Sequence, residues 1–295
     1  MKLALNWAKA VDRGAIAAVI VWPFVFLAPY TQNKLAIGND FHDAFFNCKV
    51  YVLSMLAEGR LPLWSPAEQG GTPLFSNPLV QLFYPLNLLY LAYHKVLGRF
   101  VSWDYAMLTI LGISIFGAGL YLWLRRLAIQ APAALLAVLV ATASLKVTEL
   151  IRFPNAVHSA AWMPWLLYAA TLTTERRFLM GGAAIFGAAL VLLVTAGYPY
   201  FVIYAVFLIG PYVAAMSFTW SRNVLLGGEP EKASPKIAYM AYISGSALIA
   251  GAVVWPWVRH VQDLIAQMLV RGKPNFQFAT EHHFIRPATD AAFLL

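Results

Sequence analysis

The sequence predicts an all-α polytopic membrane protein, and three observations point to this class. Hydrophobic residues make up 61% of the 295 residues and charged residues only 12%, whereas soluble domains average about 25% charged residues. The mean hydropathy is +0.66. Apolar runs close to the roughly 20 residues that cross a bilayer recur along the chain, without the alternating segments of about 10 residues typical of a transmembrane β-barrel. We therefore expect residues 1–295 to form one helical bundle.

Seven apolar runs predict membrane helices. A signal peptide would show a cleavage site of small residues after a short apolar core, but the first run continues through aromatic residues, so we expect a retained span. The runs cover residues 14–31, 105–124, 131–146, 159–174, 178–196, 200–218 and 237–257. An eighth run, 79–97, contains Pro85, Asn87 and His94. Its length fits a true span or a re-entrant or interfacial helix, so the sequence predicts seven or eight membrane helices.

Basic residues in short loops predict the orientation of the chain, because such loops face the cytoplasm. If 79–97 does not cross, the short loops on the side of the N-terminus carry Arg125, Arg126, Arg176, Arg177, Arg222, Lys232 and Lys236. We therefore expect a cytoplasmic N-terminus and a cytoplasmic linker over 219–236. A first extracytoplasmic loop (32–104), the 147–158 loop and an extracytoplasmic tail (258–295) then share the outer face.

The charge and cysteine content exclude two other classes of function. The formal net charge is +8, but the basic residues are spread over short loops and form no single basic face, which argues against nucleic-acid binding. Cys48 is the only cysteine, so one chain holds neither a disulfide framework nor a metal site built from several cysteines.

The first loop contains a predicted amphipathic helix over residues 44–58, of the kind that lies in the headgroup plane. Lys49 interrupts its apolar face. Asp40 and Asp43 stand at its start: Asp40 suits either a helix N-cap or a catalytic or binding role, and Asp43 a favourable charge in the first turn. His42 between them makes a metal site conceivable, but this spacing is a weak signal.

Other loop residues have structural interpretations. Gly59 follows the predicted helix and suits the position that ends it. Prolines would stiffen the turns, and Trp64 and Tyr84 would anchor the loop at the membrane interface.

The segment from Asn39 to Asn87 resembles the YfhO-like bacterial membrane proteins, which belong to the GT-C class of glycosyltransferases. The shared features are Asp40, Gly59-Arg60-Leu61-Pro62-Leu63-Trp64-Ser65-Pro66, Gly70-Gly71-Thr72-Pro73, Asn77-Pro78 and Phe83-Tyr84-Pro85-Leu86-Asn87. Later segments are similar too: Asn155-Ala156-Val157-His158, Ala161-Trp162-Met163-Pro164-Trp165 and Ala196-Gly197-Tyr198-Pro199-Tyr200. Tyr198 and Tyr200 depart from the family, where His and Gln are expected. Typical members are longer, and the chain ends in the apolar run Ala291–Leu295, so we expect a fragment.

The resemblance implies a GT-C-like helical bundle in the bacterial cytoplasmic (inner) membrane. It implies transfer of a sugar from a polyprenyl-phosphate-linked donor to a cell-envelope glycan or lipid acceptor, with Asp40 as the catalytic base and no cofactor or metal. Partners would be the lipid-linked sugar donor, the acceptor and membrane lipids. Candidate substrate-binding residues are Asp43, Arg60, His158, Arg152, Arg259 and Arg271, together with Lys146. Each basic residue also suits an interfacial anchor, and His158 a structural role.

Two other functions stay open at this stage. A transporter or flippase of a lipid-linked substrate would place ionisable groups at mid-depth in the membrane, whereas the predicted spans hold almost none. A truncated, non-catalytic homologue would bind a lipid without turnover. Glu281-His282-His283 lacks the helical spacing of a zinc-protease motif.

Overall fold

The computed structural model describes residues 2–38, 40–66, 71–144, 149–226 and 234–267. The described chain is almost entirely helical, with one short antiparallel pair of strands. The elements are α1 (Lys2–Phe26), α2 (Ala28–Thr31), η1 (Phe41–Phe46), α3 (Asn47–Ala57), β1 (Trp64–Ser65), β2 (Thr72–Pro73), η2 (Pro78–Val80), α4 (Leu86–Leu97), α5 (Ser102–Arg126), α6 (Ala131–Thr142), α8 (Pro154–Ala161), α9 (Met163–Leu172), η3 (Arg176–Phe178), α10 (Leu179–Thr195), α11 (Pro199–Met216), α12 (Thr219–Leu226) and α13 (Lys236–Gln267).

Four described helices are long and apolar enough to cross a membrane, so the prediction of an all-α membrane protein is confirmed. They are Ser102–Arg126, Arg176–Thr195, Pro199–Met216 and Lys236–Leu264. Helix α4 has 12 residues, or about 18 Å at 1.5 Å per residue. This is shorter than the roughly 30 Å hydrocarbon core, so α4 alone does not reach across it; α6 has the same length.

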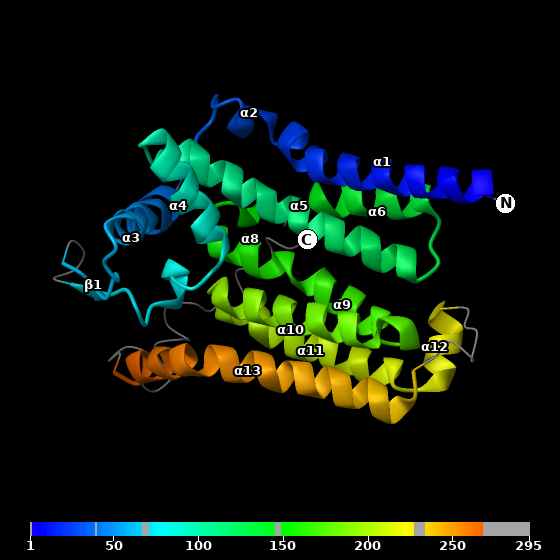
Figure 1. Ribbon diagram of the computed structural model, residues 1–295. Coiled ribbons are helices and arrows are strands. Elements are labelled where there is room, and N and C mark those ends of the chain that lie inside the picture. Colours follow the sequence, from blue (N-terminus) through cyan, green and yellow to red (C-terminus); the bar gives the residue numbers. More distant parts are fainter. Residues whose placement is uncertain (1, 39, 67–70, 145–148, 227–233, 268–295) are drawn as a thin grey trace, which may run out of the picture.

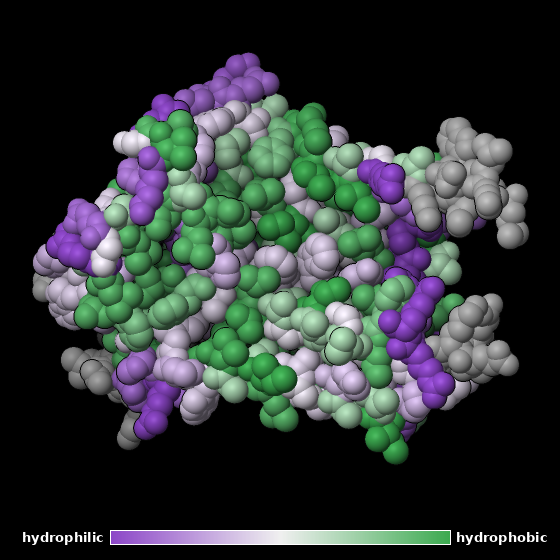
Figure 2. Space-filling view, viewed as in Figure 1, coloured by the Kyte–Doolittle hydropathy of each residue, from purple (hydrophilic) through white to green (hydrophobic). Residues whose placement is uncertain are grey.

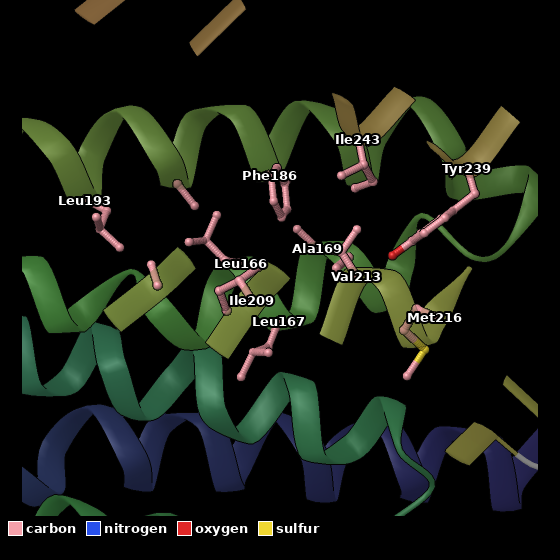
Figure 3. Packing of buried hydrophobic residues seen from close by; sticks show 13 residues of the cluster. Leu166, Leu167, Ala169, Phe186, Leu193, Ile209, Val213, Met216, Tyr239 and Ile243 are labelled. Atoms are coloured by element: carbon pink, nitrogen blue, oxygen red, sulfur yellow. The ribbon is translucent and has the colours of Figure 1, made fainter. Parts of the chain in front are cut away.

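Helix α5 joins the two halves of the bundle, since it packs against α1 and α6 on one side and against α8 and α9 on the other (Figure 1). The larger apolar cluster lies among α9, α10, α11 and α13. Figure 3 shows its side chains pointing toward one another, with Leu166 of α9, Phe186 of α10, Ile209 of α11 and Ile243 of α13 in the centre. These helices are apolar on all sides, as is typical of membrane bundles, and the residues of each that face inward form this cluster.

The flank of the bundle is strongly apolar. Figure 2 shows hydrophobic residues across the side of the molecule, with hydrophilic residues gathered toward its ends. Phe207 of α11 and Leu248 of α13 are 75% and 74% exposed. Exposed apolar surface of this extent marks a face covered by lipid or protein, as expected for spanning helices.

Segments that lie far apart in the sequence meet at one end of the bundle, which we call the loop end. It holds α3, the two strands, α4, the start of α8, the 196–198 turn and the end of α13 (Figure 1). Trp257 Nε1 donates to Phe75 O at 2.9 Å, and Asn155 Nδ2 donates to Gly197 O at 3.4 Å. The described parts of 32–104, 147–158 and the segment after 257 therefore lie at one end of the bundle; that this end faces outward stays a prediction.

Two predicted boundaries need correction. Helix α13 runs to Gln267, beyond the predicted end of its span at 257, because Trp257 and His260 pack against Phe83 and Phe75 of the first loop. The segment 219–236, predicted as a linker, begins with α12. Arg222 of this helix is buried and donates to Met216 O and Ser234 O at 2.5 and 2.6 Å, which ties the segment to its two ends.

Candidate functional site at the loop end

Asp40 directly precedes the π-helix η1 and is exposed. Its side chain makes no capping hydrogen bond, so the N-cap interpretation does not describe it. The next residue, Phe41, is buried and lies against Tyr105 of α5, with ring centroids 5.2 Å apart and the rings tilted by 33°. Phe45 is also buried, 6.2 Å from the ring of Phe153. The aromatic residues of η1 thus hold it to the bundle, while the Asp40 carboxylate faces solvent.

The other predicted substrate contacts are spread over the loop end. Asp43 lies within η1. Arg60 is exposed and pairs with Glu58. Arg152 pairs with Glu149 at 3.1 Å, and its guanidinium lies 4.8 Å from the Phe153 ring. Arg259 is exposed on α13, whereas Arg271, Lys146 and Glu281-His282-His283 lie outside the described residues.

Gly59 ends α3 as predicted. Its φ is +75°, its N–H donates to Leu56 O, and the N–H of Arg60 donates to Met55 O. This pair of bonds is the Schellman pattern, in which a left-handed residue closes the helix. Tyr84, predicted as an interfacial anchor, is instead buried, and its hydroxyl accepts from Trp162 Nε1 at 3.0 Å.

The most distinctive feature of the loop end is Lys49, which is only 2% exposed. Its Nζ donates to Val80 O at 2.9 Å, Gln81 Oε1 at 3.1 Å and Asn87 Oδ1 at 3.0 Å. Asn87 Nδ2 donates in turn to Gln81 O. Three acceptors match the three N–H donors of an ammonium group, so this residue ties α3 to the 78–87 segment.

Burial also changes the acid–base properties of this group. It lowers the pKa of Lys49 to about 7, because the charged form loses its hydration. The described partners of Nζ are neutral carbonyl oxygens rather than carboxylates. Hydrogen bonds, and not an opposite charge, therefore offset the cost of burying this amine.

Gln81 extends the network to α8 and the 196–198 turn. Its Nε2 donates to Ala196 O at 2.8 Å and lies 3.2 Å from His158 Nδ1. Gln81 follows η2 as its C-cap residue and adopts a left-handed φ of +58°. Gly197 has a φ of +81°, and a Cβ there would lie 1.9 Å from Pro78 O, so only glycine permits this approach of the turn to the loop.

Both ring nitrogens of His158 have hydrogen-bond partners in the same network. Its Nε2 lies 3.2 Å from Leu108 O, which can only accept, so Nε2 carries the proton and Nδ1 accepts from Gln81. Burial lowers the pKa of His158 to about 4, and the ring is therefore neutral at pH 7. Contact with an acceptor or a phosphate would require one of these two hydrogen bonds to open.

A cavity of about 340 Å³ lies beside this network between α5, α8 and α11. Its lining is mostly apolar, with the rings of Tyr198 and Tyr204. Val157 and Ile113, which line it, belong to the same apolar cluster as Phe41 and Phe45 of η1. The residues that hold η1 thus continue into the wall of this cavity.

Sequence reasoning did not identify Lys49, Gln81 and Asn87 as one cluster. The usable signal was Lys49, whose charge interrupts the apolar face of the predicted 44–58 helix. Among the described residues, no three His, Cys, Asp or Glu side chains gather as a metal site. Comparisons of the chain with protein-family models, curated proteins and solved structures find no match.

Proposed function

We propose that this membrane protein transfers a sugar from a polyprenyl-phosphate donor to a cell-envelope glycan or lipid acceptor at the loop end. The observation that carries the proposal is the position of Asp40. Its side chain is exposed and makes no capping hydrogen bond, yet the next residue, Phe41, is buried against α5. A carboxylate on an anchored backbone, at the end of an apolar bundle, supports a role at the surface of a bilayer.

The proposed step is a single displacement at the anomeric carbon of the donor sugar. The acceptor hydroxyl oxygen forms a bond to this carbon while the bond to the phosphate oxygen breaks. Polyprenyl phosphate leaves with the bonding electrons, and the hydroxyl proton passes to the Asp40 carboxylate, which acts as the general base. The leaving phosphate is already a stable anion, so the step needs no metal in principle.

Basic side chains at the loop end would stabilise the charge of the leaving phosphate. Arg152 suits this role, because its Nε is buried without a partner while the side chain as a whole is half-exposed. Arg60, Arg259 and Arg271 are further candidates, and Asp43 and His158 are proposed substrate contacts. The apolar cavity beside α8 and α11 would suit the first isoprene units of the donor.

The proposal includes an orientation. Seven crossings, by α1, α5, α6, the 159–174 run, α10, α11 and α13, would place the loop end outside a bacterial cytoplasmic membrane and the N-terminus in the cytoplasm. Helix α6 is as short as α4, but it packs along α1 and α5, whereas α4 packs on α3 at the loop end. The arginines at the opposite end of the bundle support this sidedness, since short cytoplasmic loops carry such residues.

Sugar transfer and substrate flux can be separated in one reconstituted system. Purified protein is placed in vesicles with a polyprenyl-phosphate hexose and an envelope lipid extract as acceptor, and products are followed by mass spectrometry. Sugar-modified acceptor together with free polyprenyl phosphate supports the enzyme. Movement of intact donor between leaflets without modified acceptor would support a flippase instead, and neither activity would indicate a non-catalytic homologue.

A further inference from the structure

A second cavity, of about 390 Å³, lies between the end of α1, helix α4 and the first turns of α5. Its volume falls within the range of about 300–1,000 Å³ found for small-molecule sites. It meets the network of Lys49 and His158 only at Leu108 and contains one charged residue, Asp104. The lining residues are Phe24, Leu89, Tyr90, Tyr93, Trp103, Asp104, Met107, Leu108 and Leu111.

Asp104 is 6% exposed and has one unused oxygen. Its Oδ1 accepts from the hydroxyl of Tyr93 at 2.9 Å, whereas Oδ2 is buried without a hydrogen-bond partner. The residue lies in the first turn of α5, where the helix dipole favours negative charge. The dipole accounts for the charge but does not satisfy Oδ2, and an unsatisfied buried carboxylate oxygen is costly.

The polar groups that line the cavity have already used their donors. The hydroxyl of Tyr90 donates to Val101 O at 3.2 Å, and Trp103 Nε1 donates to Thr31 O at 3.0 Å. The lining contains no Lys, Arg or His. What the cavity offers is therefore one anionic acceptor and several aromatic rings, with no free side-chain donor for a phosphate or a sugar oxygen.

We infer that this cavity binds a primary ammonium group, whose N–H donates to Asp104 Oδ2 beside the rings of Tyr90 and Tyr93. A cation is attracted both by the carboxylate and by the aromatic faces. The ammonium can belong to a small organic amine or to the headgroup of an aminophospholipid. Leu88 and Leu89 of α4 are 66% and 60% exposed, so a bilayer would cover the rim of the cavity. The inference does not depend on the proposed function.

Binding is tested on the full chain in detergent with ethylammonium chloride, titrated against sodium chloride at equal ionic strength and followed by calorimetry. Asp104→Asn should weaken binding by about tenfold or more, because a charge-assisted hydrogen bond is lost. Asp263→Asn is the matched control, since Asp263 is exposed on α13, and it should bind as the wild type does. Equal affinity in wild type and Asp104→Asn, or no binding above the sodium control, would overturn the inference.

A second variant covers the case in which Asp104→Asn does not fold. Leu89→Lys places an ammonium at the exposed rim, where it should compete with the ligand and abolish ethylammonium binding. Unchanged binding in this folded variant would contradict the assignment. The source of the ammonium is read from nanodiscs of equal phosphatidylethanolamine and phosphatidylglycerol, by native mass spectrometry. Enrichment of phosphatidylethanolamine that Asp104→Asn removes supports a lipid headgroup; ethylammonium binding without this enrichment supports a free amine.

Discussion

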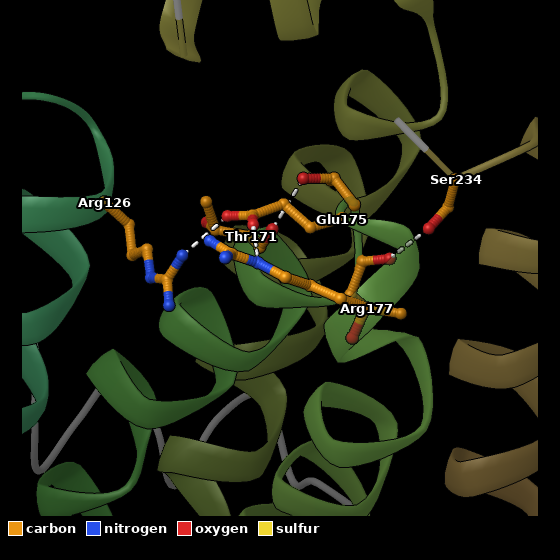
Figure 4. A network of polar contacts seen from close by, with 7 residues as sticks. Arg126, Thr171, Glu175, Arg177 and Ser234 are labelled. Carbon is orange, nitrogen blue, oxygen red and sulfur yellow. Dashed lines mark hydrogen bonds and ion pairs between the residues drawn. The ribbon is translucent and has the colours of Figure 1, made fainter. Parts of the chain in front are cut away.

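Two groups of polar side chains, one at each end of the bundle, are held in different ways. At the loop end, Lys49 is buried among neutral acceptors. At the opposite end, Arg126 and Arg177 pair with Glu175 at 2.6 and 3.1 Å, and Figure 4 shows both guanidinium groups reaching this one carboxylate. Arg177 is 71% exposed, so water screens its pair.

This difference predicts how a single substitution in each group changes the free energy of unfolding. Ion pairs near the surface contribute about 0–1 kcal/mol each, since water already solvates both charges. In the buried network, removal of one member leaves its partners unpaired away from water, at about 1–3 kcal/mol per group. The Lys49 network should therefore depend on every member, whereas the ion pairs of Glu175 should tolerate single changes. Buried Arg222, at the same end as Glu175, donates to backbone carbonyls and should behave like Lys49.

The largest effect is expected for Lys49→Met, which keeps the length of the side chain but removes its donors. Val80, Gln81 and Asn87 would each lose a hydrogen bond, so the free energy of unfolding should fall by about 3 kcal/mol. Denaturant titration in detergent measures the loss. Lys236→Met is the control, because Lys236 is exposed over the Phe218 ring. Similar small losses in both variants would show that the buried lysine contributes no more to stability than the exposed one.

Gly197→Ala tests the approach of the 196–198 turn to Pro78. The added Cβ would meet Pro78 O, and the positive φ is itself unfavourable for alanine, so we expect a loss of about 2–3 kcal/mol. Gly210→Ala is the matched control, since nothing lies within 4 Å of a Cβ there. Equal stability of the two variants would contradict this packing.

Most of the helices could be predicted from the sequence because their signals are local. Each of the seven apolar runs overlaps a helix of the structure. Gly59 predicted the end of α3, because a residue with a left-handed conformation closes the helix and glycine adopts it most readily. The burial of Lys49 could not be predicted in this way. Its partners lie 31 to 38 residues away, and the Gln81–Ala196 bond spans 115 residues, so no periodicity records them.

A pH-dependent effect, smaller per pH unit than the two losses above, is expected from His158. Its pKa in the folded chain is about 4, below the ordinary 6.5, so the unfolded chain binds the proton more tightly. The free energy of unfolding should therefore fall as the pH falls from 6.5 to 4, by about 1 kcal/mol per pH unit. Unfolding measured across this range checks the slope. His158→Gln should reduce it, and an unchanged slope in that variant would assign the titration to another group.

The smallest effect is expected for Arg177→Gln at the opposite end. The screened pair with Glu175 should contribute no more than about 0.5 kcal/mol, and Arg126 still pairs with the same carboxylate. Thermal unfolding at low and high salt measures the change. A loss as large as that of Lys49→Met would mean that these ion pairs contribute as much to stability as the buried Lys49 network.

The site itself was only partly predictable. The sequence located Asp40 at the start of a helix in the first loop, but it left capping and catalysis open, and the missing capping bond needed the structure. The burial of Asp104 and its cavity could not be predicted, because no motif surrounds this residue at the end of the first loop. Its partner Tyr93 lies in a different helix, α4.

The proposed chemistry at the loop end is tested most directly by Asp40→Asn in vesicles that contain a polyprenyl-phosphate hexose and envelope lipids. We expect sugar transfer to fall by at least about a hundredfold, the lower range for loss of a general base, with stability unchanged. Glu58→Gln, another exposed acid of this loop, should keep wild-type transfer. Transfer by Asp40→Asn at the wild-type rate would contradict the assignment of this carboxylate as the base.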